Sequence, residues 1–386
     1  MNGLTAGGIP IARIFGIEVR VHLSWVFILA IITVGVGSQL IVSQPGWSDL
    51  LRWGVAASVS LTFFLSVLAH ELAHGLLAQR HGMGGGTVTL LFFGGATTQG
   101  REAVRPRDEA IVAAAGPVAS GLVTAAFVAT WFAADVLPGD FGDAAAQVAV
   151  VLAVLNGMLT LLNLLPVYPL DGGRILRAVI WQATGSETRA TRGVALASRI
   201  GGWGLVVAGL AVLLTGDTLD GILLAICGWF LVSSARAVAR RLALEDLLRG
   251  MRVENVMERD LPAVSPQLTL DTFAAQYLAS GEGTSLPVMR DETLLGLIGI
   301  SQLRRIRRSA WATMRASDVM VSPPALPTLA PDDELWPALE RLRRAGLDGL
   351  PVLRGDQLLG VLTRRGVVSA IQQRLRPPTG PVGAVP

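Results

Sequence analysis

Three residues between positions 70 and 74 could hold and use a metal ion. His70 and His74 are four residues apart, and Glu71 follows the first of them. On a helix, side chains four positions apart project from one face, so both imidazoles could bind one ion. Zinc accepts two imidazoles and a carboxylate and keeps a fourth position for a water, whose proton Glu71 is placed to take. The alternative is a chance match in which both histidines are ordinary helix residues.

The surroundings of this motif are as apolar as a membrane span. Residues 61–80 read LTFFLSVLAHELAHGLLAQR, and polar or charged residues in such a span are costly and usually functional. The chain has 386 residues, of which 16% are charged, and its mean hydropathy is +0.53. A soluble protein of this length would be more polar, so we expect part of the chain to lie in a lipid bilayer.

Six apolar segments are long enough to cross a hydrocarbon core of about 30 Å at about 1.5 Å per residue. They are residues 22–42, 55–79, 110–133, 145–165, 195–215 and 219–238. Basic loops at 80–107, 174–192 and 236–241 alternate with acidic loops at 135–143 and 217–220. This is the positive-inside pattern, so we expect both termini in the cytosol. It also accounts for a pI near 9.9 without a nucleic-acid partner.

Glycines interrupt the helical pattern between the second and third spans. Residues 87–93 and 96–99 are β-rich runs around a short turn, which predicts a hairpin. A hairpin this apolar beside the metal helix would be partly buried, and an open edge could add a strand of another peptide. Phe93, Gly94 and Gly95 are therefore candidate substrate-binding residues. The alternative is a plain cytosolic connector.

Residues 1–20 carry Arg13, Glu18 and Arg20 and show no small-residue cleavage site after a short apolar core. This pattern does not fit a cleaved signal peptide. We expect these residues to form a short cytosolic lead-in to the first span.

A second motif, NLLPVYPLDGG at residues 163–173, ends the fourth span. Pro166 and Pro169 stop the helix, so Asp171 is expected on non-helical backbone at membrane depth, where such backbone occurs only inside protein or along a watery cavity. Asp171 is therefore a candidate third metal ligand or, alternatively, the cap of the helix that follows. The amide of Asn163 could donate to a developing oxyanion or hold a substrate backbone.

The two motifs together, HELAH in one span and NLLPVYPLDGG in a later one, resemble the site-2 protease family of intramembrane zinc metalloproteases. The resemblance covers residues 13–241. It implies that His70, His74 and Asp171 bind one zinc ion per chain. It also implies that Glu71 is the general base and that Asn163 assists the substrate or the oxyanion.

The third span and the hairpin are also similar to that family. Gly116 and Pro117 form the step found there, whereas Ser120 stands where many members carry asparagine. Small residues permit close helix packing, so a packing role alone could explain these three residues and Ala115 beside them.

Beyond residue 242 charges become frequent and the sequence repeats itself. VENVM at 253–257 aligns with ASDVM at 316–320, and LPVMRDETLLGLI at 286–298 aligns with LPVLRGDQLLGVL at 350–362. Each copy is predicted to contain a short strand, a helix at 271–279 or 333–345, two β-rich runs and a closing helix. Neither copy offers a large core alone, so the copies should pack as a pair.

This tail resembles a tandem of CBS domains. The expected boundaries are a membrane protease domain at 1–242, a linker at 243–250, CBS domains at 251–312 and 313–376, and a flexible end at 377–386. Such pairs commonly bind adenine nucleotides through Thr or Ser and an Asp three residues later. Here Thr363 is followed by Gly366, and the first copy has Gly299 and Gln302. Thr363 is therefore the one nucleotide-binding candidate.

The predicted fold is a multi-pass α-helical membrane protein with six transmembrane helices, a membrane-associated β-hairpin and a cytosolic α/β tandem CBS domain. The hypothesis is a zinc endopeptidase of a prokaryotic plasma membrane that cleaves transmembrane segments of protein substrates. Its CBS pair could regulate cleavage through an adenine nucleotide or hold a homodimer together. The alternatives are a CBS-gated transporter or channel, and an inactive relative with a structural zinc.

Overall fold

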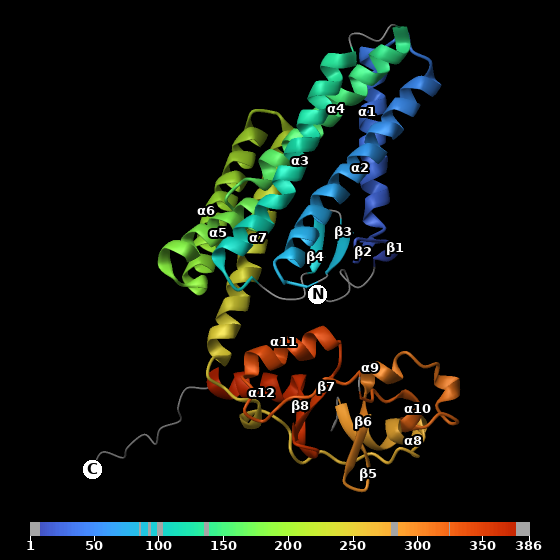
Figure 1. Cartoon of the computed structure of the whole chain (residues 1–386), viewed down its shortest axis with the longest axis vertical. Helices are drawn as coiled ribbons and strands as arrows, with labels where there is room; N and C mark the ends of the chain where they lie inside the picture. Colours follow the sequence, from blue (N-terminus) through green and yellow to red (C-terminus); the bar gives the residue numbers. More distant parts are fainter. Residues whose placement is uncertain are drawn as a thin grey trace, which may run out of the picture. The chain divides into compact units, whose positions relative to one another are not determined.

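The chain divides into two compact units in the computed structural model, Met1–Arg240 and Arg241–Pro386 (Figure 1). The structure describes residues 8–84, 86–91, 94–98, 103–134, 139–278, 285–323 and 325–375. Each unit has hydrophobic clusters of its own, around Val19 and Leu68 in the first and around Leu335 and Leu350 in the second.

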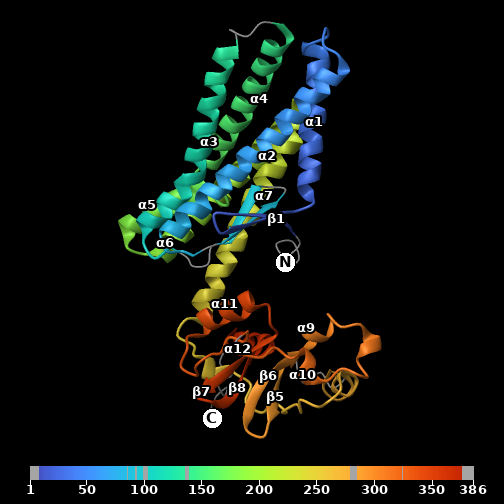
Figure 2. The ribbon, with the colours of Figure 1, turned by 45° about the vertical axis from the view of Figure 1, so that its right-hand side comes forward.

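Six of the described helices are long and apolar enough to cross a membrane, which confirms the six predicted spans. They are α1 (Ser24–Ser43), α2 (Asp49–Arg80), α3 (Pro106–Ala134), α4 (Gly139–Asn163), α6 (Glu187–Leu214) and α7 (Thr218–Leu248). Helix α3 packs along α4 and along α2 (Figure 2). Large apolar side chains such as Phe132, Leu161 and Trp229 are exposed on these helices, as expected of surfaces that face lipid.

A four-stranded sheet accompanies these helices, and half of it was not expected. Strand β1 (Ile9–Ile14) pairs antiparallel with β2 (Ile17–Val21), β2 pairs parallel with β3 (Thr87–Leu91), and β3 pairs antiparallel with β4 (Gly94–Thr98). The predicted hairpin is confirmed as β3 and β4. Strands β1 and β2 were not predicted, and they lie almost entirely within residues 1–20, where the sequence indicated only a short lead-in. Phe15 and Gly16 have φ angles of 50° and 82°, the backbone of a tight hairpin turn between two β-rich runs.

One face of the sheet is buried against the helix that carries both histidines. Ile17, Val19 and Val88 are fully buried and belong to one hydrophobic cluster with residues of α1 and α2. A Cβ at Gly75 would lie 2.8 Å from Cδ1 of Ile17. The glycine after His74 therefore lets β2 lie close to the metal helix.

A tight turn joins α4 to α5 (Asp171–Thr184). Helix α5 is not among the six candidate spans. A Cβ at Gly172 would fall on the carbonyl oxygen atoms of Leu164 and Leu165, and one at Gly173 would fall on the carbonyl of Val167. Only glycine permits this approach, which fixes where α5 begins.

The second unit contains the predicted repeat as two matching hairpins. Strands β5 (Ser285–Arg290) and β6 (Thr293–Gly299) pair in the same register as β7 (Gly349–Arg354) and β8 (Gln357–Thr363). Both hairpins also have a bulge at the same place in the first strand, after Val288 and after Val352. Strand β5 contacts β8 and β6 contacts β7, so the copies pack as a pair. The expected short first strand is a single parallel bridge in each copy.

The helices of the two copies differ more than the strands. The first copy has α8 (Leu270–Phe273), which continues as the π-helix η2 (Ala274–Leu278), whereas the second has α11 (Leu335–Ala345). The closing helices are α9 (Ile300–Leu303) and the longer α12 (Arg364–Leu375). The short helices η1 (Val253–Asn255), η3 (Arg308–Ala310) and α10 (Ala316–Val319) complete the unit. The predicted end of the first helix at Ala279 lies outside the described residues.

Candidate metal centre

The two histidines of α2 lie one helical turn apart and are both buried, with 3% of each residue exposed. Their Nε2 atoms are 3.3 Å apart. Because the two side chains project from one face of the helix, both rings present the same nitrogen to the same point. Burial in an apolar span makes such a pair costly unless another group uses it.

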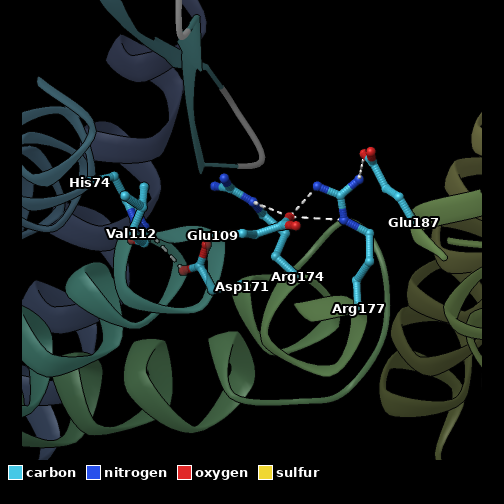
Figure 3. Close-up of polar contacts among 7 residues, drawn as sticks. All are labelled: His74, Glu109, Val112, Asp171, Arg174, Arg177 and Glu187. Carbon is cyan, nitrogen blue, oxygen red and sulfur yellow. Dashed lines mark hydrogen bonds and ion pairs between the residues drawn. The ribbon is translucent and has the colours of Figure 1, made fainter. Parts of the chain in front are cut away.

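Asp171 brings a carboxylate to that point from a segment 97 residues away (Figure 3). Its Oδ2 atom is 3.2 Å from Nε2 of His70 and 3.2 Å from Nε2 of His74. The three ligand atoms therefore form a nearly equilateral triangle. The structure thus brings together the three residues that the sequence proposed as ligands.

The size of this triangle fits zinc. Zinc bonds of about 2.0–2.2 Å to nitrogen and oxygen in a tetrahedron separate two ligand atoms by about 3.3–3.6 Å. Gly116 of α3 backs the site, since a Cβ there would fall on the Nε2 atoms of both His70 and His74. The donor set, its spacing and the space kept by this glycine all suit one divalent ion with two imidazole ligands and one carboxylate ligand.

The far nitrogen of each ring contacts α3. Nδ1 of His70 is 2.9 Å from Oγ of Ser120, and Nδ1 of His74 is 2.7 Å from the carbonyl oxygen of Val112. Such contacts fix the orientation and the tautomer of metal-binding histidines. A carbonyl acceptor requires that Nδ1 of His74 carry the proton, which leaves Nε2 for a metal. Sequence reasoning found a packing role sufficient for Ser120, although this hydroxyl lies in an apolar span at a place where many members of the resembled family carry asparagine.

Asp171 is the first residue of α5, so the expectation of non-helical backbone at this position is wrong. The proline-rich turn ends one residue earlier, at Leu170. This residue is the N-cap of α5, and its side chain makes no capping hydrogen bond. The alternative role of Asp171 as a side-chain cap is not the one observed, since its carboxylate faces the histidines.

The two candidate catalytic residues, Glu71 and Asn163, are close in sequence to the metal ligands. Glu71 is buried between the two histidines on α2. Asn163 is the last residue of α4, and its Nδ2 donates to the carbonyl of Leu159 at 3.0 Å. One of its two amide protons is thus used within its own helix.

Two of the three predicted substrate-binding residues lie at the start of the second strand of the hairpin. Gly94 and Gly95 are in β4, paired with Leu91 and Leu90. Phe93 lies outside the described residues. Strand β4 is at one end of the strand order and contacts α2.

A separate candidate site lies in the second unit beside Thr363. A cleft of about 870 Å³ there is lined by Glu258, Arg365, Gly366 and other residues. The Thr363 hydroxyl donates to Oε1 of Glu258 and accepts from the backbone N–H of Gly366 at 3.0 Å. A Cβ at Gly366 would lie 2.7 Å from the carbonyl oxygen of Val256, which explains why no acid stands there. Glu258 brings a carboxylate to the same place from the other copy.

The first copy differs at the equivalent place. Oε1 of Gln302 accepts from the backbone N–H of Gly299 at 2.9 Å, so this side chain caps its own short helix. The acid comes from the second copy here as well, because Oδ2 of Asp348 accepts from the N–H of Ser301 at 2.8 Å. The cleft there is smaller, about 420 Å³.

Comparison with known proteins adds two family matches. The model described as peptidase family M50 matches residues 140–208, and the CBS domain model matches residues 316–373. A Mycobacterium tuberculosis protein named "Putative zinc metalloprotease Rip3" is 34% identical over 366 residues, covering 94% of this chain and 92% of that protein.

Two solved structures are also similar. The site-2 protease from Methanocaldococcus jannaschii is 22% identical with a TM-score of 0.41, covering 60% of this chain and 95% of its own. The structure of CBSX2 in complex with AMP is 28% identical with a TM-score of 0.28, covering 33% of this chain and 100% of its own.

Proposed function

The chain belongs to peptidase family M50, the site-2 protease family of zinc metalloproteases, and on that premise we propose that it cleaves peptide bonds within transmembrane segments of other membrane proteins. The observation that carries the proposal is the triangle of His70, His74 and Asp171. Two of its corners lie on a candidate membrane span and the third follows the turn that ends another. A hydrolytic centre at that depth suits a substrate that is itself in the bilayer.

The proposal assigns one zinc ion per chain to His70, His74 and Asp171. When bound, zinc supplies a Lewis acid for the scissile carbonyl and lowers the pKa of a water ligand. The protein's part is to hold the three ligands: Ser120 and the Val112 carbonyl keep both imidazoles turned toward Asp171.

Glu71 is assigned the transfer of the water proton, and Asn163 is assigned the stabilisation of the oxyanion. The Glu71 carboxylate would take the proton of the attacking water and then deliver it to the nitrogen of the leaving amine. Its burial next to the ligands supports this role. The second amide proton of Asn163 would hold the substrate backbone or the developing oxyanion.

The edge strand β4 is the proposed substrate contact. A transmembrane helix satisfies its amide groups internally, so a stretch must unwind before its carbonyl can be attacked. The free edge of β4, with Gly94 and Gly95, would offer main-chain partners to the unwound stretch, and Phe93 is the third residue assigned to this contact. The contact of β4 with α2 supports this assignment, because α2 carries both histidines.

The second unit is assigned a regulatory role. We propose that an adenine nucleotide binds the cleft beside Thr363, with Glu258 in place of the missing acid, and that its binding alters cleavage. The proposal also puts both termini in the cytosol of a prokaryotic cell, where nucleotides are available. It allows two chains to associate through their CBS pairs. The hydrogen bond between Thr363 and Glu258 supports the nucleotide assignment.

Replacing Glu71 by glutamine tests the proteolytic function. Purified full-length protein should cleave a membrane-protein substrate about 10²- to 10⁴-fold more slowly as Glu71→Gln, the range expected for loss of a general base. Its zinc content should stay at one per chain by metal analysis. Glu18→Gln, the same change on β2, is the control and should cleave like wild type. Equal cleavage by wild type and Glu71→Gln would refute the assignment.

A further inference from the structure

A chain of charged side chains links α3, α5 and α6 close to the metal centre (Figure 3). Nε of Arg177 on α5 donates to Oε1 of Glu109 on α3 at 2.8 Å, and a second nitrogen of the same guanidinium donates to the same oxygen. Its third nitrogen donates to Oε1 of Glu187 on α6 at 3.0 Å. Arg174 approaches Glu109 to 3.9 Å. One guanidinium thus holds carboxylates from two other helices.

The burial of this pair is costly. The Glu109 side chain is fully buried, and its Oε2 has no hydrogen-bond partner among the described residues. Burial lowers the pKa of the Arg177 guanidinium, but the Glu109 carboxylate and other nearby groups together raise that pKa by more, so the net pKa lies above the ordinary value and Arg177 stays charged. Buried ion pairs are often no more stable than apolar side chains of the same size. Stability alone is therefore a weak reason for this pair.

Its position in the chain gives a better reason. Glu109 lies three residues before Val112, whose carbonyl contacts His74, and Arg177 lies six residues after Asp171, about 9 Å along α5. The first turns of α3 therefore contact α2 through a histidine ligand and α5 through Arg177. Helix α3 supplies no ligand, but it contacts both of the helices that do.

A second contact at the same end of α3 has the same effect. Asp108, the residue before Glu109, has its Oδ1 2.9 Å from Nδ1 of His81, which follows the last residue of α2. Two consecutive acids at the start of α3 thus contact both metal-bearing helices. Ser120 holds His70 further along α3. Helix α3 thus contacts both histidines directly, and it contacts the helix of Asp171 through Glu109.

We propose that the Glu109–Arg177 ion pair is a positioning device that sets α5 against α3 so that the Asp171 carboxylate meets both imidazoles. The proposal rests on the zinc site proposed above. Glu187, whose side chain is 41% exposed, holds the outer side of the guanidinium and contributes less. Glu109 and Arg177 touch neither metal nor substrate in this account, and they act only through Asp171.

The test compares zinc affinity with folding. Full-length Glu109→Gln in detergent, titrated with zinc against a chromophoric chelator, should bind zinc about 10- to 100-fold more weakly, the usual effect of losing an outer-shell partner. Glu187→Gln removes the same charge from the exposed side of Arg177 and should shift the affinity far less. A wild-type zinc affinity for Glu109→Gln, or an equal loss in both variants, would overturn the proposal.

A double variant separates positioning from folding. Glu109→Gln with Arg177→Met removes both buried charges, so the zinc-free protein should unfold at a temperature no lower than that of Glu109→Gln alone. Zinc affinity should stay weak, because the link between α3 and α5 is gone. If the double variant recovered both the unfolding temperature and the zinc affinity of wild type, the pair would serve only to avoid an unpaired charge. The proposal would then fail. If wild type holds zinc but cleaves nothing, the proteolytic function fails while the positioning result stands.

Discussion

The metal centre of the first unit and the cleft beside Thr363 in the second both depend on a carboxylate from a distant segment, but they hold it differently. At the metal centre, three atoms lie 3.2–3.3 Å apart and buried contacts to α3 fix both rings. In the cleft, Glu258 meets one hydroxyl at the border of a cavity of about 870 Å³.

The difference shows what each kind of site requires of the fold. A metal needs its ligands at fixed distances, so a small displacement of one helix removes the function. A cleft needs volume and a few polar groups, so its acid can come from another segment while the fold stays the same. The two hairpins keep one register although Gly299 and Gln302 stand where the second copy has Thr363 and Gly366.

The largest effect on zinc binding is expected from the addition of one methyl group at the metal centre. In Gly116→Ala the new Cβ would fall on the Nε2 atoms of both histidines, so zinc binding should weaken by more than about 100-fold, the upper value for changes around a metal site. Gly121→Ala on the same helix is the control, because its Cβ would be 3.9 Å from Cγ2 of Thr160, an ordinary contact. Metal analysis of both purified proteins is the measurement. Full zinc occupancy in Gly116→Ala would mean that the histidines and the ion lie elsewhere.

A smaller effect is expected from the hydroxyl that contacts His70. Ser120→Ala should weaken zinc binding about 10- to 100-fold, because the ring loses the partner that orients it. The control is Ser66→Ala on α2, whose hydroxyl donates only to the carbonyl of Thr62 in its own helix. Competition with a chelator should rank wild type and Ser66→Ala together, above Ser120→Ala. Equal affinities for all three would assign Ser120 to packing alone.

These partners mark the limit of what the sequence could predict. His70, His74 and Asp171 were found because ligand chemistry restricts residue types and spacing. The contact from Val112 is made by a backbone carbonyl, which any residue carries, so no pattern could reveal it. Asp171 was expected outside a helix because two prolines precede it, but a turn of seven residues after Asn163 was enough for α5 to begin at Asp171 itself.

The two hairpins of the first unit illustrate the same point. The one with many glycines was predicted from its composition, whereas β1 and β2 were missed although Phe15 and Gly16 separate two β-rich runs. Those runs read as a lead-in because β3, the strand that joins β2 to the rest of the sheet, lies about 70 residues further on. In the second unit the repeat predicted both hairpins. The acid of the cleft was missed because Glu258 and Thr363 are 105 residues apart.

An effect no larger than that of Ser120→Ala is expected in the cleft beside Thr363. Full-length wild type should bind AMP, and Glu258→Gln should bind it about 10- to 100-fold more weakly, since a hydrogen bond to a charged group contributes about 1.5–3 kcal/mol. Asp356→Asn, in the exposed turn between β7 and β8, is the control and should bind like wild type. Isothermal titration calorimetry gives the affinities, and cleavage rates with and without AMP show whether the cleft affects the metal centre. If wild type does not bind AMP, the cleft has another ligand. If Glu258→Gln binds AMP as well as wild type does, Glu258 does not replace the missing acid.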